Sequence, residues 1–287
     1  MNQPACVTCV ADSCFKGFDI SVFISRFVPV IFSPEYMNRR EMLKKTGAVI
    51  AGASLLGVDA FAQQPDNDNT EPKQRRALII GAHPDDPETG CGGTMILLKQ
   101  AGYEVVSIYM TRGHRGIEGK TLGEAASIRT REGEQACEIL GAQPVFMSQI
   151  DGDTEINKSR YAEMRYLIES YSPDIVFTHW PIDSHPDHRV CSLLVYDAWR
   201  RLDYCFELYY YEVMSGTQTQ YFHPTDYIDI TAVAEQKRRA CYCHESQNIR
   251  PLYEKWHDPM EHFRGIELRC DRAEAFIHVR RDKNYII

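Results

Sequence analysis

Two short clusters of histidine and aspartate could carry chemistry in this chain. The first is His83-Pro84-Asp85-Asp86, and the second is His185-Pro186-Asp187-His188. Neighbouring carboxylates repel each other, and a structural turn needs only one Asp. The pair at 85 and 86 therefore indicates a metal ion, a proton-transfer role, or one of each.

The spacing within both clusters suits a hydrolytic metal site. Zinc and similar ions bind imidazole nitrogen and carboxylate oxygen, and such sites keep three protein ligands and one open position for water. His83 and Asp86 lie on either side of a proline turn, so both could reach one ion. His185 and His188 are at i and i+3 where a helix is expected to begin, so one could bind the ion while the other stays free nearby. These residues predict a site with two His ligands and one carboxylate ligand, and the remaining Asp and His could act as base and acid.

Each cluster also has a structural explanation. Two aspartates before a proline are typical of a helix start, and His-Pro-Asp-His could be a surface turn. Both clusters, however, follow an expected strand, although they lie about a hundred residues apart in the sequence. A shared site explains this double coincidence better than two unrelated turns.

Strand and helix patterns alternate along the chain after residue 74. Strands are expected over 76–81, 104–110, 144–147, 174–178, 205–213 and 274–279, and helices over 93–101, 123–140, 158–171, 186–202, 233–246 and 252–264. This order predicts an α/β fold with a Rossmann-like, mostly parallel sheet and helices on both faces. Sites in such sheets form at the carboxyl ends of the strands, which is where both clusters lie.

Charge and glycine patterns argue against two classes of partner. The formal net charge of −8 does not favour nucleic acid, which would require a basic face. The chain has no G-x-x-x-x-G-K-[ST] loop, and the run Gly90-Cys91-Gly92-Gly93 is not G-x-G-x-x-G. No nucleotide cofactor is therefore expected, despite the Rossmann-like order.

The first 62 residues contain the pattern of an export signal. Met37 begins the segment MNRREMLKKTGAVIAGASLLGVDAFAQQ, in which Arg39 and Arg40 precede an apolar run at 48–58 and a small-x-small site at 60–62. The apolar run is too short to span a membrane stably, and the paired arginines resemble a twin-arginine signal. We therefore expect export, with the periplasm as the destination. The expected parts are an upstream extension from a misassigned start (1–36), a signal peptide (37–62), a flexible linker (63–74) and a single domain (75–287).

Several motifs in order resemble the PIG-L/LmbE-like metal-dependent N-deacetylases. They are Ala82-His-Pro-Asp-Asp86 with a following Glu and Gly-Gly, Thr111-Arg-Gly113, Arg129-x-x-Glu132 with Leu140-Gly141, His185-Pro-Asp-His188, Asp229-Ile-Thr231 and His244-Glu-Ser-Gln247. The likeness covers about residues 75 to 247. The family typically removes acetyl groups from N-acetylglucosamine-type substrates, so the resemblance implies a single LmbE-like deacetylase domain with that activity.

The resemblance also implies roles for individual residues. His83, Asp86 and His188 correspond to the family's zinc ligands, although another divalent ion could take the place of Zn²⁺. Asp85 corresponds to the general base and His185 to the general acid or oxyanion partner, which Asp187 could orient. Adjacent carboxylates are tolerated in such a site because the cation neutralises one of them.

Other residues are expected near the substrate. Arg112 resembles a substrate-binding arginine of the family, while His114 on the same loop and His244 could also face the substrate. Glu132 is expected to be a buried partner of Arg129. Many relatives continue directly from Asp-Asp to Glu, whereas Pro87 intervenes here, so the resemblance assigns no role to Glu88.

The leading hypothesis is therefore a zinc-dependent N-deacetylase whose partner is a small amino-sugar or glycoconjugate. An amidase acting on another amide, such as a thiol-sugar conjugate, keeps the same site. A protein that only binds metal or sugar would need neither Asp85 nor His185. A two-metal phosphoesterase would need further ligands, and the sequence suggests no third cluster.

Overall fold

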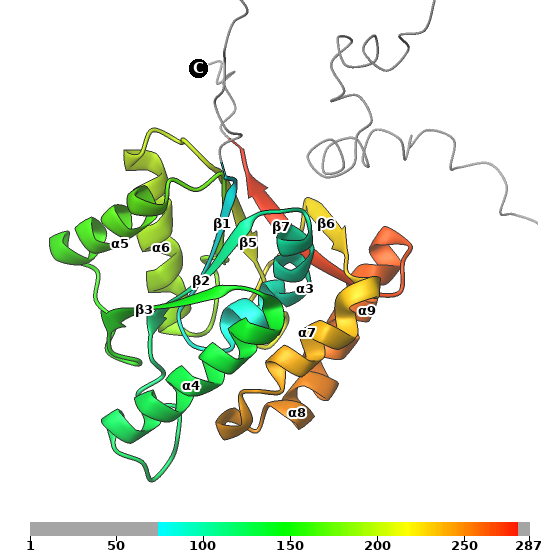
Figure 1. Cartoon of the computed structure of the whole chain (residues 1–287), viewed down its shortest axis with the longest axis horizontal. Coiled ribbons are helices and arrows are strands. Elements are labelled where there is room, and N and C mark those ends of the chain that lie inside the picture. The colour runs from blue at the N-terminus through cyan, green and yellow to red at the C-terminus, as the bar shows by residue number, and fades with distance from the viewer. Residues whose placement is uncertain (1–73, 281–287) are drawn as a thin grey trace, which may run out of the picture. The chain divides into compact units, whose positions relative to one another are not determined.

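A seven-stranded sheet forms the centre of the protein, for which a computed structural model describes residues 74–280. The strands lie in the order β3-β2-β1-β4-β5-β7-β6 (Figure 1). β1 to β5 are parallel, whereas β7 runs antiparallel to both β5 and β6. Their bounds are Arg76–Gly81 (β1), Glu104–Thr111 (β2), Gln143–Gln149 (β3), Ile175–His179 (β4), Glu207–Tyr211 (β5), Asp226–Asp229 (β6) and Ala273–Val279 (β7). The predicted mostly parallel sheet is confirmed.

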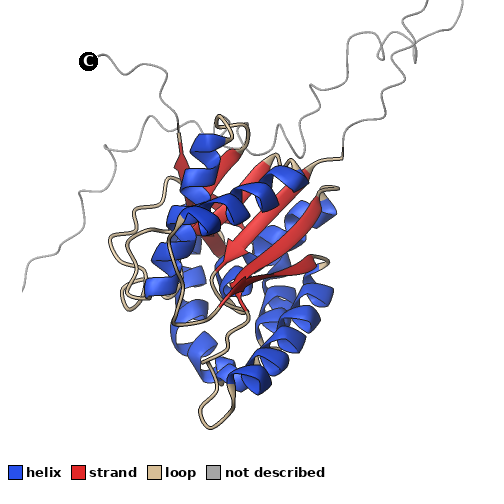
Figure 2. Cartoon of the chain, turned by 90° about the vertical axis from the view of Figure 1, so that its left-hand side faces the viewer, coloured by secondary structure: helices blue, strands red, loops and turns tan. Residues whose placement is uncertain are grey.

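Helices cover both faces of this sheet (Figures 1 and 2). One face carries α5 and α6, and the other carries α3, α4, α7 and α9. Their bounds are Asp86–Gln100 (α3), Leu122–Leu140 (α4), Lys158–Tyr171 (α5), Pro186–Arg201 (α6), Ala234–Cys241 (α7), Ile249–Leu252 (α8) and Asp258–Leu268 (α9), with a π-helical turn at Tyr253–His257. No helix in the described part of the chain is both long and apolar enough to cross a membrane.

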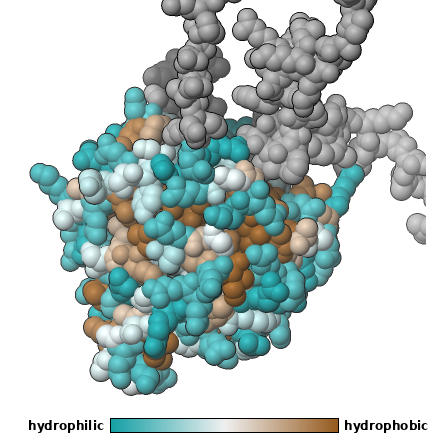
Figure 3. Space-filling model, viewed as in Figure 1, coloured by the Kyte–Doolittle hydropathy of each residue, from teal (hydrophilic) through white to brown (hydrophobic). Residues whose placement is uncertain are grey.

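The core is divided by the sheet because neighbouring strand residues face opposite sides. Leu78 and Ile80 of β1 pack into the cluster under α5 and α6, together with Leu194 of α6. β1 and β2 are buried on both faces, so their sequences are mostly apolar rather than alternating, with Ser107 as a buried polar residue inside β2. Hydrophobic and hydrophilic residues are interspersed on the face shown in Figure 3, as on most folded domains.

Several elements differ from the expectation. α3 begins at Asp86 rather than at residue 93, with Asp85 as its N-cap and Pro87 in the first turn, where proline is favourable. β6 was not expected because four residues give too short a pattern to recognise. The predicted extension and signal peptide, and the linker apart from Gln74, lie outside the described residues.

Candidate active site

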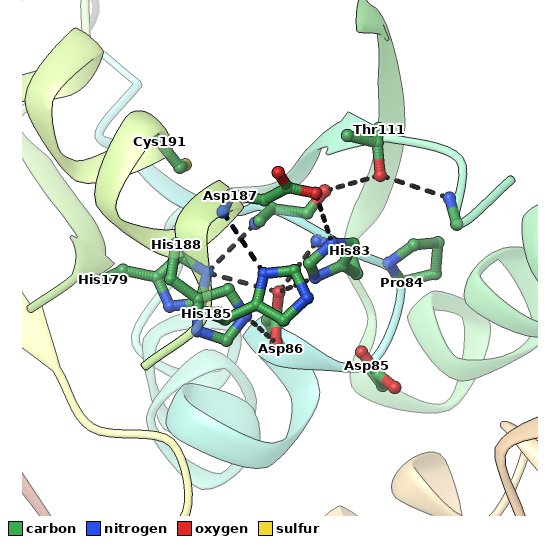
Figure 4. A network of polar contacts seen from close by, with 12 residues as sticks. His83, Pro84, Asp85, Asp86, Thr111, His179, His185, Asp187, His188 and Cys191 are labelled. Carbon is green, nitrogen blue, oxygen red and sulfur yellow. Dashed lines mark hydrogen bonds and ion pairs between the residues drawn. The ribbon is translucent and has the colours of Figure 1, made fainter. Parts of the chain in front are cut away.

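The two predicted clusters meet at the carboxyl edge of the sheet. β1 and β4 are parallel neighbours, and they end at Gly81 and His179. The loops that follow lead into α3 and α6, so segments about a hundred residues apart converge on one site (Figure 4). The helix-start explanation holds as well, because Asp85 and His185 are the N-cap residues of α3 and α6.

The carboxylate of Asp86 lies between the two other predicted ligands. Its Oδ2 is 3.2 Å from His83 Nδ1, and its Oδ1 is 3.3 Å from His188 Nε2. All three residues are buried. Ligand atoms around a tetrahedral zinc ion are about 3.4 Å apart when each bond is about 2.1 Å, and each of the two distances is close to that spacing. They involve different oxygens of Asp86, and within residues 74–280 the three side chains do not form one of the groups whose ligand atoms all lie within 4.8 Å of one another.

Three overlapping groups of side chains in residues 74–280 have potential ligand atoms within 4.8 Å of one another. His188 belongs to two of these groups, one with Asp86 and one with His83. The groups are His83, His185 and His188; His83, Asp151, His185 and Asp187; and Asp86, His179 and His188. The donor set of imidazoles and carboxylates therefore suits a divalent cation, and His83, His185 and His188 each belong to two of the three groups.

The second nitrogen of His83 faces two further carboxylates. His83 Nε2 is 3.1 Å from Asp187 Oδ2 and 3.3 Å from Asp151 Oδ1. Burial would lower the pKa of His83, but Asp151, Asp187 and Asp86 together raise this pKa well above its usual value. Carboxylates placed in this way orient a metal-binding histidine and increase its basicity.

His188 has a similar environment. Its Nδ1 lies 3.2 Å from Asp183 Oδ1, and its ring stacks on that of His179 at a centroid distance of 3.9 Å. Burial lowers the pKa of His188, but Asp86 and Asp183 outweigh burial and raise it to about 9. The backbone N–H of Ala82 donates to His179 Nε2, and this hydrogen bond holds the His179 ring in the position where it stacks on His188.

Asp85 is held by residues from two helices. Its carboxylate accepts a hydrogen bond of 2.9 Å from Arg129 of α4, and its backbone N–H donates to Glu88 of α3. Burial raises the pKa of Asp85, Arg129 partly offsets that effect, and the charge of Asp86 adds to it. Glu88 is fully buried and also accepts a hydrogen bond from Tyr109, which gives it a structural role.

His185 is held in one tautomer by the main chain. Its Nδ1 accepts the backbone N–H of Asp187 at 3.2 Å, so the neutral ring carries its proton on Nε2. Burial and the neighbouring His83 lower the pKa of His185. Asp187 therefore orients His185 through its N–H, while its carboxylate contacts His83, Gly152 and Thr154 instead.

The predicted substrate residues lie in three different environments. Arg112 donates to Thr130 and stacks on Phe146, which directs its guanidinium towards α4 and β3. His114 is half-buried on the loop between β2 and α4. His244 is fully buried, with Nε2 3.5 Å from Glu88, so it offers no surface to a substrate in this conformation.

Sequence reasoning missed four residues of this site: Asp151, His179, Asp183 and Arg129. Asp151 follows β3, so the strand-end rule that identified the two clusters could have found it. The expected partner of Arg129 is wrong, because Glu132 instead accepts hydrogen bonds from Ser246. Arg129 contacts Asp85 directly, whereas Arg112 contacts Thr130 and Phe146, and its predicted contact with substrate stays a prediction.

Comparisons with known proteins identify the family of this chain. The profile of the family described as "PIG-L: GlcNAc-PI de-N-acetylase" matches residues 78–199. The diacetylchitobiose deacetylase of Thermococcus kodakarensis is 31% identical over 219 residues, which cover 71% of this chain and 80% of that protein. The 4-oxalmesaconate hydratase of Pseudomonas putida is 24% identical over 62% of this chain and 76% of its own length.

A solved structure leads to the same assignment. The N,N'-diacetylchitobiose deacetylase from Pyrococcus horikoshii, solved with its inhibitor, superposes with a TM-score of 0.63 and 26% identity. The match covers 72% of this chain and 84% of that one. The chain therefore belongs to the PIG-L/LmbE-like deacetylase family.

Proposed function

We propose that this protein is a zinc-dependent hydrolase that removes the acetyl group from the nitrogen of an N-acetylglucosamine-type sugar or glycoconjugate. The observation that carries the proposal is the placement of Asp86 between His83 and His188, with Asp85 and His185 beside it. His83, Asp86 and His188 would hold the ion. When bound, zinc lowers the pKa of a water molecule and polarises an amide carbonyl.

Asp85 is the base in this proposal. It accepts a proton from the water that adds to the amide carbon, and the same proton then passes to the sugar nitrogen as the C–N bond breaks. The products are acetate and a free amine. The raised pKa of Asp85, caused first by burial, favours this role because a base works best when its pKa is not far below the working pH.

His185 stabilises the charge that develops on the amide oxygen. Its pKa is lowered by burial and by His83, so the ring is neutral near neutral pH and donates from Nε2. The backbone N–H of Asp187 donates to Nδ1, so Nδ1 is the acceptor nitrogen of the ring and Nε2 carries the proton. The Nε2–H group is therefore the one that can donate to the amide oxygen. We therefore assign His185 as an oxyanion partner first, with general acid catalysis as the alternative.

Acetate release by residues 63–287 tests the proposal. The purified protein is incubated with N,N'-diacetylchitobiose and a panel of N-acetylglucosamine glycosides, with a chelator, and with zinc added back. We expect release that the chelator abolishes and zinc restores, together with loss of one acetyl mass from the sugar. Loss of turnover in Asp85→Asn with zinc retained would separate an enzyme from a protein that only binds metal.

Two alternatives have their own outcomes in the same assay. An amidase for another amide, such as a thiol-sugar conjugate, would release no acetate from the panel but would cleave that conjugate. The resemblance to the 4-oxalmesaconate hydratase of Pseudomonas putida supports a second test, in which the protein is incubated with 4-oxalmesaconate and hydration is measured without acetate release. One bound metal per chain without any turnover would indicate a binding role.

We also propose that the protein is exported to the periplasm by the twin-arginine signal at 37–62. The support is the sequence pattern alone, with Arg39 and Arg40 before the apolar run. Fractionation of cells that express the full chain should recover a protein beginning near Gln63 in the periplasm. Substitution of both arginines by lysine should leave the precursor in the cytoplasm.

A further inference from the structure

Arg129 connects α4 to the loop that carries the proposed base. Arg129 is only 3% exposed, and its Nη2 donates both to the carbonyl of Pro84 and to Asp85 Oδ2. The two acceptors are consecutive residues, so one nitrogen holds the main chain and the carboxylate of the same loop. The bond to the carboxylate is 2.9 Å long.

The loop needs such support because Asp85 has a strained backbone. Its φ is +123° and its ψ is −29°, a combination that a residue with a Cβ adopts only when its surroundings enforce it. The N–H of Asp85 is held by Glu88 at 3.1 Å. Arg129 supplies the hold on the side chain and on the preceding carbonyl.

Two glycines leave the space that the guanidinium occupies. A Cβ on Gly113 would lie 2.4 Å from Arg129 Cδ, and a Cβ on Gly116 would lie 2.5 Å from Arg129 Nη1. Both glycines belong to the loop between β2 and α4, which packs directly over Arg129. In the motif Thr111-Arg112-Gly113, the glycine therefore matters for the position of Arg129, while Arg112 itself points to Phe146.

We propose that Arg129 is a positioning residue that fixes the carboxylate of Asp85 for proton transfer, and that Gly113 and Gly116 keep its guanidinium in place. The inference rests on the proposed function, because it assigns Asp85 as the base. It differs from a substrate-binding role for the same arginine, because a positioning residue acts on kcat, the rate at which bound substrate reacts. A residue that only contacts substrate acts mainly on KM.

The test compares kcat and KM for acetate release among four proteins with their metal bound. Arg129→Ala removes the guanidinium, and Gly116→Ala displaces it without changing any charge. Gly123→Ala is the matched control, because a Cβ there meets nothing within 4 Å. Wild type is the fourth protein. Zinc content and the unfolding temperature are measured for each.

The expected result is a selective loss of kcat. Arg129→Ala should lose about 100-fold in kcat and Gly116→Ala about tenfold, since displacing a catalytic group by about 1 Å costs rate on this scale. KM should stay within about twofold, and Gly123→Ala should keep the kcat and KM of wild type. Low millimolar guanidinium should restore kcat in Arg129→Ala but not in Gly116→Ala, in which the cavity remains filled by Arg129.

Three outcomes would overturn the inference. A rise in KM with unchanged kcat would show that Arg129 contacts the substrate. A loss of zinc in proportion to activity would show that it supports the metal site, and unchanged kinetics would show no role. If wild type itself releases no acetate from any substrate, the proposed function fails and this inference fails with it. If wild type is active and the variants have unchanged kinetics, only the role of Arg129 fails.

Discussion

Buried carboxylates beside the second nitrogens of His83 and His188 determine how well these histidines can bind a metal. Asp183 lies 3.2 Å from His188 Nδ1 and also accepts a hydrogen bond from Thr219. It holds the ring so that Nε2 faces Asp86. Partners of this kind typically contribute about 10- to 100-fold to metal affinity.

Asp183→Asn should therefore weaken zinc binding by about 10- to 100-fold, because an amide orients the ring without increasing its basicity. The measurement is zinc affinity by competition with a chelator of known strength. Asp153→Asn is the control, since the side chain of Asp153 is 75% exposed and its contact to Arg115 is 3.9 Å. Equal zinc affinities in both variants would show that Asp183 does not support the metal site.

Asp85→Asn should lower kcat by about 10²- to 10⁴-fold, the usual contribution of a general base, while zinc content stays unchanged. The amide is nearly the same size as the carboxylate and can still accept a hydrogen bond from Arg129. Acetate release and metal analysis on the same preparation check this expectation. A variant with wild-type turnover would require another base.

The residues of the site could be predicted only in part from the sequence. The clusters at 83–86 and 185–188 stand out because several chemically active residues are adjacent and each cluster follows a strand. Asp151 and His179 are single polar residues on other loops or strands, and only the packed sheet brings them beside His83 and His188. Partners such as Arg129 and Asp85 are 44 residues apart, so their contact leaves no spacing signal.

At the scale of elements, α3 must approach its neighbours closely enough to place Asp86. Gly93 faces Ile230, and a Cβ on Gly93 would lie 2.5 Å from Ile230 Cγ2. The N–H groups of Gly93 and Thr94 donate to the buried carboxylate of Glu274 on β7. The glycines after Asp86 therefore serve helix packing and not phosphate binding.

Gly93→Ala should destabilise the protein by about 1 to 3 kcal/mol, because overpacking at Ile230 outweighs the better helix propensity of alanine. Gly123→Ala on α4 should instead stabilise it by about 0.5 to 1 kcal/mol, since a Cβ there meets open space. Urea unfolding of both variants measures the difference. Two variants that shift stability in the same direction would contradict this account of α3.

The order of strands and helices was predictable because long apolar or amphipathic segments have a clear period. The element bounds were less predictable where a short segment depends on tertiary contacts. α3 starts seven residues before the expected start because Asp85 and Glu88 cap it and Gly90, Gly92 and Gly93 are tolerated by close packing. β6 exists through its pairing with β7, which no local pattern in Asp226–Asp229 reveals.

Across the whole molecule, the parallel strands β1 to β4 carry the site at their carboxyl ends, and the C-terminal helices α7 and α9 pack with α3 and α4 on one face of the sheet through buried charges. Lys237 of α7 is 1% exposed and contacts Glu261 of α9 at 2.9 Å and Glu274 of β7 at 2.7 Å. These ion pairs join three elements that are distant in sequence. Breaking one of these ion pairs would leave a buried charge without its partner, which is strongly destabilising. We therefore expect the C-terminal segment to unfold together with the remainder of the domain.

His257 makes the stability of the protein sensitive to acid. Burial, with a smaller contribution from the charge of Lys237, lowers the pKa of His257 to about 3. In the unfolded chain the pKa of a histidine is about 6.5, so the unfolded state binds the proton first as the pH falls. The stability present at pH 7 is therefore lost between about pH 6.5 and pH 3, at about 1.4 kcal/mol per pH unit from this one residue.

His257→Gln should remove that loss. Between pH 7 and pH 4.5 the free energy of unfolding of wild type should fall by about 3 kcal/mol more than that of the variant, because only wild type takes up a proton at this position on unfolding. His262→Gln is the control, since the side chain of His262 is 47% exposed on α9, the helix that follows His257. Urea unfolding at each pH gives the difference, and parallel pH slopes for wild type and His257→Gln would mean that His257 is already protonated in the folded protein.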